Sequence, residues 1–145
     1  MTDPIRQASQ PGSKGVSRKR ILVVDRDEFV CNLVSKVLTG YMGLEVFQAR
    51  DSGEAIAAAL TGQYDGAIID LALARTSGAE AIRAIRTMRP RFPIVAMTGP
   101  ATEKNLNSVK GLGVIGILQK PFRIAALVEK IKEILSASEV SAVEE

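Results

Sequence analysis

The chain has 145 residues, of which 46% are hydrophobic but only six are aromatic, with no Trp. This length suits one domain with a single core, and a core with so few rings must be built from Val, Ile, Leu and Ala, which favours an α/β fold over a β-sandwich. No apolar run approaches the roughly 20 residues needed to span a bilayer, and the N-terminus lacks the hydrophobic region of a secretory signal. We therefore expect a cytoplasmic protein with no membrane-embedded part, and the lone Cys31 agrees with a reducing compartment.

The net charge of +3 is concentrated at the N-terminus. The first 20 residues hold five basic side chains and one acidic one, a balance of +4, which leaves −1 for the rest of the chain. A basic segment rich in Gly, Ser, Pro and Gln is typical of a solvated arm rather than a binding surface, so nucleic acid is a disfavoured partner. We expect a disordered arm at 1–19, a folded domain at 20–136 and a fraying acidic tail at 137–145.

Short apolar runs alternate with helical patterns along the chain. The runs predict five strands, at 21–24, 44–47, 67–69, 93–97 and 114–118. The segments between and after them predict five helices: 29–38 ended by Gly40, 54–60 ended by Gly62, 78–88, a weaker one at 101–112, and 124–135. The four arginines between Arg83 and Arg91 are interpreted as a solvated edge. Such alternation indicates a parallel sheet with right-handed crossovers and helices on both faces.

Polar residues follow four of the five predicted strands. Asp70 ends the third strand, and Asp25, Thr98 and Lys120 end the first, fourth and fifth. The carboxyl ends of parallel strands share one edge of the sheet, where ligands bind in open α/β folds. Singly, each residue also has an ordinary structural role, such as helix capping for Asp70. Together, two carboxylates, a hydroxyl and an ammonium suit phosphoryl transfer to a nucleophilic Asp70.

Several segments at fixed spacing resemble one known family. They are ILVVD at 21–25, YDGAIID at 64–70, Gly78, IVAMTG at 94–99 and LQKPF at 118–122. Over about residues 20–136 the chain resembles the receiver domain of two-component response regulators. The resemblance implies a flavodoxin-like, doubly wound five-stranded parallel sheet of order 2-1-3-4-5 with five helices. It also implies a cis peptide between Lys120 and Pro121.

The resemblance also implies a function in phosphorelay signal transduction. Asp70 would accept a phosphoryl group from a histidine kinase or histidine phosphotransfer protein, with Lys120 as phosphate partner and Thr98 as switch hydroxyl. Asp25 and Asp70 would serve a Mg²⁺ ion. The chain contains no His, so a phosphohistidine donor must be another protein. In this reading the chain is a phosphoacceptor signalling domain and not an enzyme in the ordinary sense.

Arg26 is the main departure from the family pattern, because it stands where the resemblance implies a second acidic residue that binds Mg²⁺ directly. A guanidinium offers no lone pair to a metal and keeps its positive charge, so the expectation of Mg²⁺ is weakened. Three hypotheses remain open. Arg26 pairs with Asp25 or Asp70 and fixes one conformation; it turns to solvent while Asp27 supplies the missing oxygen; or it assists an incoming phosphoryl group directly. The simplest role of Asp27 is to cap the following helix.

Two smaller departures from the family pattern concern how the domain signals to its target. Ile117 stands where an aromatic switch residue is usual, which argues against aromatic-gated signalling, and Ala74 stands where proline is usual. No effector domain follows residue 135 in the printed sequence. We therefore expect output through contacts with a downstream protein target, unless the sequence is part of a longer regulator. A homodimer is left open.

Two alternatives from other classes remain. The first is a phosphorylation-independent pseudo-receiver that binds partners, which would leave partner affinity unchanged in Asp70→Ala. The second is a haloacid-dehalogenase-type phosphatase that uses Asp25 as nucleophile and Asp27 as acid. Such an enzyme needs a further carboxylate cluster, for which the chain offers only Glu129 and Glu133. Phosphatase activity that is lost in Asp25→Ala but kept in Asp70→Ala would support it.

Overall fold

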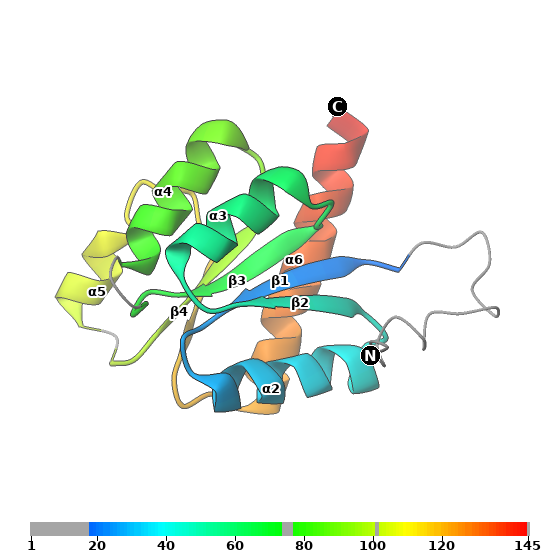
Figure 1. Ribbon diagram of the computed structural model, residues 1–145, viewed down its shortest axis with the longest axis horizontal. Helices are drawn as coiled ribbons and strands as arrows, with labels where there is room; N and C mark the ends of the chain where they lie inside the picture. The colour runs from blue at the N-terminus through cyan, green and yellow to red at the C-terminus, as the bar shows by residue number, and fades with distance from the viewer. Residues whose placement is uncertain (1–17, 74–76, 101, 145) are drawn as a thin grey trace.

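The computed structural model describes residues 18–73, 77–100 and 102–144, with side chains as far as residue 140. Ala74 and nearly all of the expected basic arm lie outside these ranges. The described elements, with the labels of Figure 1, are β1 (Arg20–Val24), α2 (Glu28–Lys36), η2 (Val37–Tyr41), β2 (Glu45–Ala49), α3 (Ser52–Thr61), β3 (Gly66–Asp70), α4 (Gly78–Met88), β4 (Ile94–Thr98), α5 (Glu103–Ser108), β5 (Gly116–Gln119) and α6 (Ile124–Glu144).

All five strands form one parallel sheet in the order β2-β1-β3-β4-β5. The predicted fold class, strand order and five α-helices are confirmed. Strands β3 and β4 are buried at every position, as expected of parallel strands covered on both faces. The carboxyl ends of β1, β3, β4 and β5 therefore meet at one edge of the sheet.

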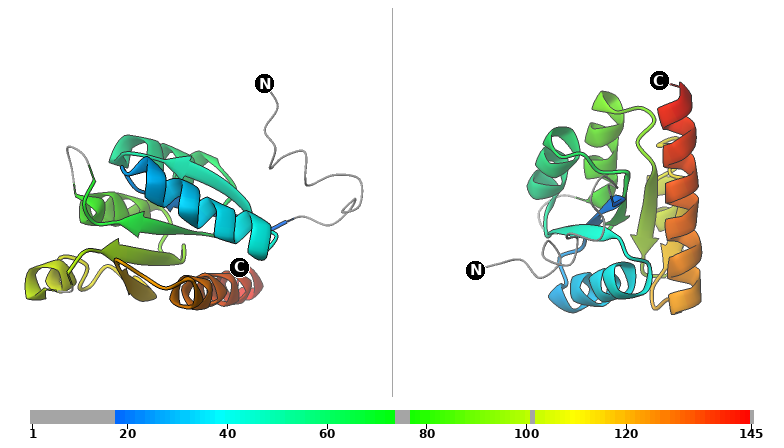
Figure 2. Two further views of the ribbon diagram at one scale, coloured as in Figure 1. Left: turned by 90° about the horizontal axis from the view of Figure 1, so that it is seen from below. Right: turned by 90° about the vertical axis from the view of Figure 1, so that its right-hand side faces the viewer.

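Helices cover both faces of the sheet (Figures 1 and 2), and a hydrophobic layer lies on each side of it. One layer packs α3 and α4 against the sheet through residues such as Ala55, Ile82 and Ile69. The other packs α2 and α6 against the opposite face through Val34, Ile131 and Ile68 among others. Because successive strand residues point to opposite faces, Ile68 and Ile69 belong to different layers.

Side-chain caps fix the start of four helices. Asp27, Asp51, Ser77 and Thr102 each accept a hydrogen bond from a backbone N–H in the first turn of α2, α3, α4 and α5, respectively. Such caps satisfy amide groups that have no partner inside the helix. The cap on α2 matters for the site, because Asp27 follows directly on Arg26.

The ends of two helices differ from the prediction. Gly40 does not stop the first predicted helix: the chain continues through the wide turn η2, and the left-handed residue is Gly43, with φ of 69°. The last helix does not end at Leu135 but continues to Glu144 through the expected acidic tail. Ser138 donates to Asp65 Oδ1 at 3.2 Å, which ties the extension to the start of β3. The helix predicted at 101–112, in contrast, is an α-helix only over Glu103–Ser108.

Arg86 shows that the predicted solvated edge of arginines was only partly right. Its guanidinium donates to the carbonyl oxygens of Leu112 at 2.9 Å and Phe92 at 2.6 Å, and to further carbonyls nearby. Burial lowers the pKa of Arg86 from its ordinary value. The side chain therefore joins the end of α4 to the segments that enter β4 and β5.

Among the helices described, none is long and apolar enough to cross a membrane.

Candidate functional site

Two buried carboxylates and one ammonium meet at the carboxyl edge of the sheet. Asp25 follows β1 and is 1% exposed, while Asp70 ends β3 and is 5% exposed. The Nζ of Lys120 lies 2.6 Å from Asp25 Oδ2 and 3.1 Å from Asp70 Oδ2. The ammonium thus bridges two carboxylates that are far apart in sequence.

The second oxygen of each carboxylate is held by a nearby backbone amide. Asp25 Oδ1 accepts from the N–H of Asp27 at 2.8 Å, and Asp70 Oδ1 accepts from that of Ala72 at 3.3 Å. Each carboxylate therefore has one contact to its own loop and one to Lys120. This arrangement orients both groups toward the same point, with Lys120 as their only charged partner among the described residues.

The sheet positions Thr98 and Lys120 beside these carboxylates. Asp70 pairs in register with Met97 in β4, so Thr98 lies one residue further toward the carboxyl edge. Thr98 is 2% exposed, and the backbone N–H of Lys120 donates to its carbonyl oxygen at 2.7 Å. Lys120 is joined to Pro121 by a cis peptide bond, as the resemblance implied. The four predicted residues therefore share one edge of the sheet.

The buried charges change the proton affinity of the groups at the site. Burial raises the pKa of Asp70, the charge of Asp25 raises it further, and Lys120 partly offsets both effects. Burial alone would lower the pKa of Lys120, but its hydrogen bonds and charge interactions with Asp25 and Asp70 raise it overall. Lys120 is therefore a permanent cation at neutral pH, and Asp70 is the carboxylate whose charge is disfavoured.

Two residues support the backbone of the acidic pair. Gly78, at the start of α4, comes so close that a Cβ there would collide with the carbonyl oxygen of Asp70, and its N–H donates to the carbonyl of Leu71 at 2.8 Å. The buried Sγ of Cys31 donates to the carbonyl oxygen of Asp25 at 3.2 Å. The motif singled out Gly78 without its physical reason, whereas the role of Cys31 was missed. Its place six residues after Asp25, in the first turn of α2, was the one available signal.

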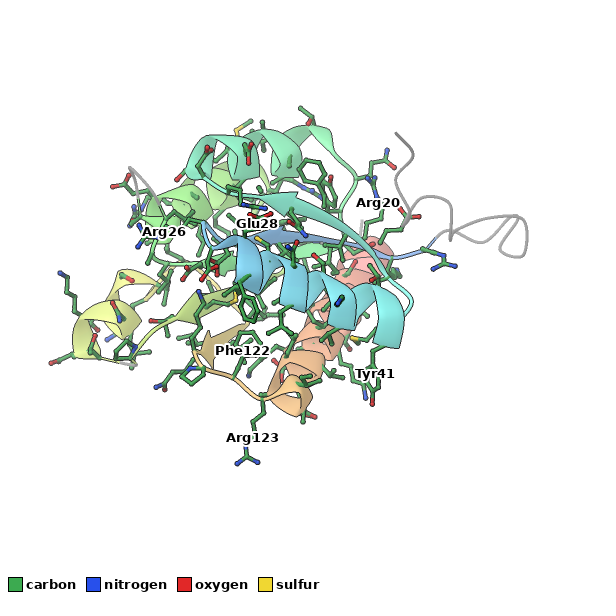
Figure 3. All side chains as sticks on the ribbon, turned by 60° about the horizontal axis from the view of Figure 1, so that its bottom comes forward. Arg20, Arg26, Glu28, Tyr41, Phe122 and Arg123 are labelled. Carbon is green, nitrogen blue, oxygen red and sulfur yellow. The ribbon has the colours of Figure 1, made fainter. Side chains whose placement is uncertain are left out.

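Arg26 does not enter the acidic pair. Its side chain is exposed on the loop between β1 and α2, and it makes no hydrogen bond or ion pair with the residues that the structure describes (Figure 3). The position that the first hypothesis gave to Arg26 is occupied by Lys120. Asp27 is also exposed, and its Oδ1 accepts from the N–H of Phe29 at 2.9 Å as the cap of α2.

The donor set does not fit a Mg²⁺ ion of the usual kind. Mg²⁺ requires hard oxygen ligands in nearly octahedral geometry. Within the described residues, no three acidic, His or Cys side chains are grouped so that they could hold a metal. Asp25 and Asp70 are bridged by Lys120, Arg26 has no oxygen to offer, and Asp27 is used as a helix cap.

The phosphatase alternative finds no support at the carboxylates it would need. Glu129 and Glu133, which the sequence offered for this role, lie on α6; Glu129 is exposed and Glu133 pairs with Lys130 at 3.6 Å. A pocket of about 370 Å³ lies at the opposite edge of the sheet, lined by Arg20, Tyr64, Arg89 and neighbouring residues. It contains none of the predicted site residues.

Comparison with known proteins decides the family. The sequence profile described as "Response regulator receiver domain" matches residues 21–132. The chain belongs to the response regulator receiver domain family. Receiver domains are signalling domains that interact with histidine kinases and with downstream effector domains, and they typically bind Mg²⁺ at the phosphorylation site.

Solved structures agree with this assignment. The CheY-like response regulator receiver domain protein of Methanospirillum hungatei JF-1 is 30% identical, with a TM-score of 0.80, and the alignment covers 86% of this chain and 99% of that one. The chemotaxis response regulator CheY4 of Vibrio cholerae is 28% identical with a TM-score of 0.74, over 82% of this receiver and 100% of CheY4.

Curated relatives are longer. The alkaline phosphatase synthesis transcriptional regulatory protein PhoP of Bacillus subtilis is 32% identical over 126 residues, which are 86% of this chain and 51% of PhoP. PrrA of Mycobacterium tuberculosis is 29% identical over 83% of this chain and 52% of PrrA. The receiver described here thus spans about half the length of these relatives.

Proposed function

We propose that this receiver accepts a phosphoryl group on Asp70 in a two-component phosphorelay and signals through protein contacts. The observation that carries the proposal is the convergence of Asp70, Asp25 and Lys120 at one buried edge of the sheet. In the reaction, the P–N bond of a donor phosphohistidine breaks and its electron pair returns to the imidazole, while an Asp70 oxygen forms the new P–O bond. The donor is a histidine kinase or a histidine phosphotransfer protein.

The neighbouring groups have defined roles in this proposal. Lys120 balances the negative charge that gathers on the phosphoryl oxygens, as a pre-positioned cation does in phosphoryl transfer. The Thr98 hydroxyl is the partner that reports the new group to β4 and the loop before α5. Ile117, which is half-buried in β5, takes no part as an aromatic gate.

A second candidate function follows from Arg26. If the loss of the acidic residue has disabled the acceptor, the domain is a pseudo-receiver whose partners bind irrespective of phosphate. The bridge of Lys120 between Asp25 and Asp70 favours this candidate, because it balances part of the charge of the acidic pair without metal or phosphate. The two candidates differ in one measurable property, which is covalent labelling of Asp70.

The deciding experiment is intact-mass spectrometry after incubation with phosphoramidate in the presence of Mg²⁺. The proposal expects one acid-stable, base-labile phosphoryl adduct, absent in Asp70→Asn. Asp65→Asn, an acidic residue at the opposite edge of the sheet, serves as the matched control and keeps the adduct. Complete absence of labelling in the unmodified protein would refute phosphoacceptance and leave the pseudo-receiver.

A further inference from the structure

The charge of the acceptor site is the starting point. Asp25 and Asp70 carry two negative charges in a nearly water-free position, and Lys120 supplies one positive charge. One negative charge is left uncompensated by the residues in contact. An incoming phosphoryl group would add more, so the site needs another cation to accept it.

In the family, a carboxylate at the position of Arg26 together with Mg²⁺ would give the site one net positive charge, because the metal carries two charges and the carboxylate removes one. Arg26 gives the same single positive charge without metal. The substitution therefore changes the chemical nature of the cation but not the charge balance of the site.

The position of Arg26, and the absence of a hydrogen bond or ion pair to it from the described residues, agree with this role. Arg26 follows directly on Asp25, whose Oδ2 is 2.6 Å from Lys120 Nζ, and its guanidinium is uncommitted among the described residues. Figure 3 shows Arg26 on the loop that precedes α2, on the same side as Glu28 and away from Tyr41 at the far end of η2. Guanidinium groups bind phosphoryl oxygens through two parallel N–H donors, which an ammonium cannot do.

We propose that Arg26 replaces the divalent cation, so that Lys120 and Arg26 together hold the phosphoryl group and the site works without Mg²⁺. The inference rests on the proposed function for its phosphoryl part, whereas its exclusion of metal stands on the donor set alone. With phosphoramidate as donor, the P–N bond breaks, ammonia leaves with the electron pair, and Asp70 forms the P–O bond. No metal ion or further reactant is needed for the atoms and charges to balance.

Labelling with phosphoramidate in EDTA and in Mg²⁺ tests the phosphoryl part. We expect the unmodified protein to be labelled at Asp70 at equal rates in both conditions. Arg26→Ala is expected to slow labelling in EDTA about 100-fold, the lower end of the range for loss of one hydrogen-bond donor to developing negative charge. Arg26→Lys retains the charge, so its labelling rate in EDTA is expected to lie between those of the unmodified protein and Arg26→Ala. Arg83→Ala, which removes an exposed arginine of α4, is the matched control and should match the unmodified protein.

Arg26→Asp converts the site to the family pattern and should make labelling depend on Mg²⁺. This variant is expected to lose labelling in EDTA and to recover it with Mg²⁺. Unmodified protein that is labelled with Mg²⁺ but not in EDTA overturns the inference and leaves the proposed function intact. Labelling confined to Arg26→Asp overturns both, because Arg26 then blocks the acceptor.

Mn²⁺ provides a readout that does not depend on phosphorylation. Its unpaired electrons broaden the NMR signals of nearby amides, so a bound ion would affect the amides around Asp25 and Asp70. We expect no selective broadening in the unmodified protein and clear broadening in Arg26→Asp. Selective broadening in the unmodified protein would overturn the exclusion of metal. An unlabelled protein that also excludes Mn²⁺ would remove the proposed function while the exclusion of metal stands.

Discussion

The negative charge of Asp70 lowers the free energy of unfolding of the folded protein. Its pKa is raised by burial first and by Asp25 second, so the folded state favours the protonated form more than the unfolded chain does. A raised carboxyl pKa means that ionisation opposes folding, and this cost is fully present above the folded pKa. As the pH falls through the folded pKa the cost is relieved, and below the ordinary value of about 4 it is absent.

Asp70→Asn is therefore expected to raise the free energy of unfolding at neutral pH by about 1 kcal/mol, the common scale of single substitutions. The variant leaves Lys120 paired with Asp25 at 2.6 Å, so the ammonium does not lose all its partners. Urea unfolding measured between about pH 4 and about pH 8 should show the gain shrinking toward acid. A variant less stable than the unmodified protein at neutral pH would contradict this account of the site.

At the scale of single elements, the cap of α2 is expected to affect stability but not the labelling of Asp70. Asp27→Ala removes the acceptor for the N–H of Phe29 and should cost about 1 kcal/mol in the free energy of unfolding. Asp51→Ala, the equivalent change at α3, should cost a similar amount. Neither should alter the labelling of Asp70 once both proteins are folded. A loss of labelling in Asp27→Ala alone would instead show that Asp27 supplies the oxygen missing at position 26.

The junction between β3 and α4 gives a second test at this scale. A Cβ at Gly78 would collide with the backbone of Asp70 and Leu71, so Gly78→Ala should cost about 2 kcal/mol, as overpacking commonly does. Labelling of Asp70 should fall as well, because the acceptor's own backbone must move. Gly40→Ala is the control, since a Cβ there meets nothing within 4 Å. Equal stability and labelling of the two variants would exclude a positioning role for Gly78.

The strands were predictable from sequence patterns, whereas the ends of the helices were not. Five apolar runs were enough to predict a parallel sheet, because a strand buried on both faces leaves a clear signal. Helix ends were harder to predict. The prediction used Gly40 as a stop, but the left-handed residue is Gly43. The extension of α6 is tied to the sheet by a contact between Ser138 and Asp65, which are far apart in the sequence. The stop at Gly40 and the end at Leu135 were therefore both wrong.

The site was predictable as a set of residues but not as a geometry. The rule that parallel strands end at one edge brought Asp25, Asp70, Thr98 and Lys120 together. Lys120 bridges Asp25 and Asp70, which lie 95 and 50 positions before it in the sequence. Local sequence patterns do not predict the distances between such residues. Arg86 was assigned to solvent for the same reason, because its carbonyl partners lie in loops that only the fold brings near.

At the scale of the whole molecule, one sheet couples two separate hydrophobic layers. Ile82 of α4 and Ile131 of α6 are both fully buried, but they lie on opposite faces of the sheet. Each Ile→Val change removes one buried methyl group and should cost about 1 kcal/mol. Because the two residues belong to separate hydrophobic clusters, the double variant should lose about 2 kcal/mol, within roughly 0.5 kcal/mol of the sum.

The sheet should also make unfolding a single event, because losing either layer would expose strands such as β3 and β4 that are buried at every position. Thermal unfolding of both single variants should therefore show one transition by circular dichroism and by calorimetry, lowered to a similar degree. Two transitions, each shifted by only one of the variants, would mean that the layers unfold independently.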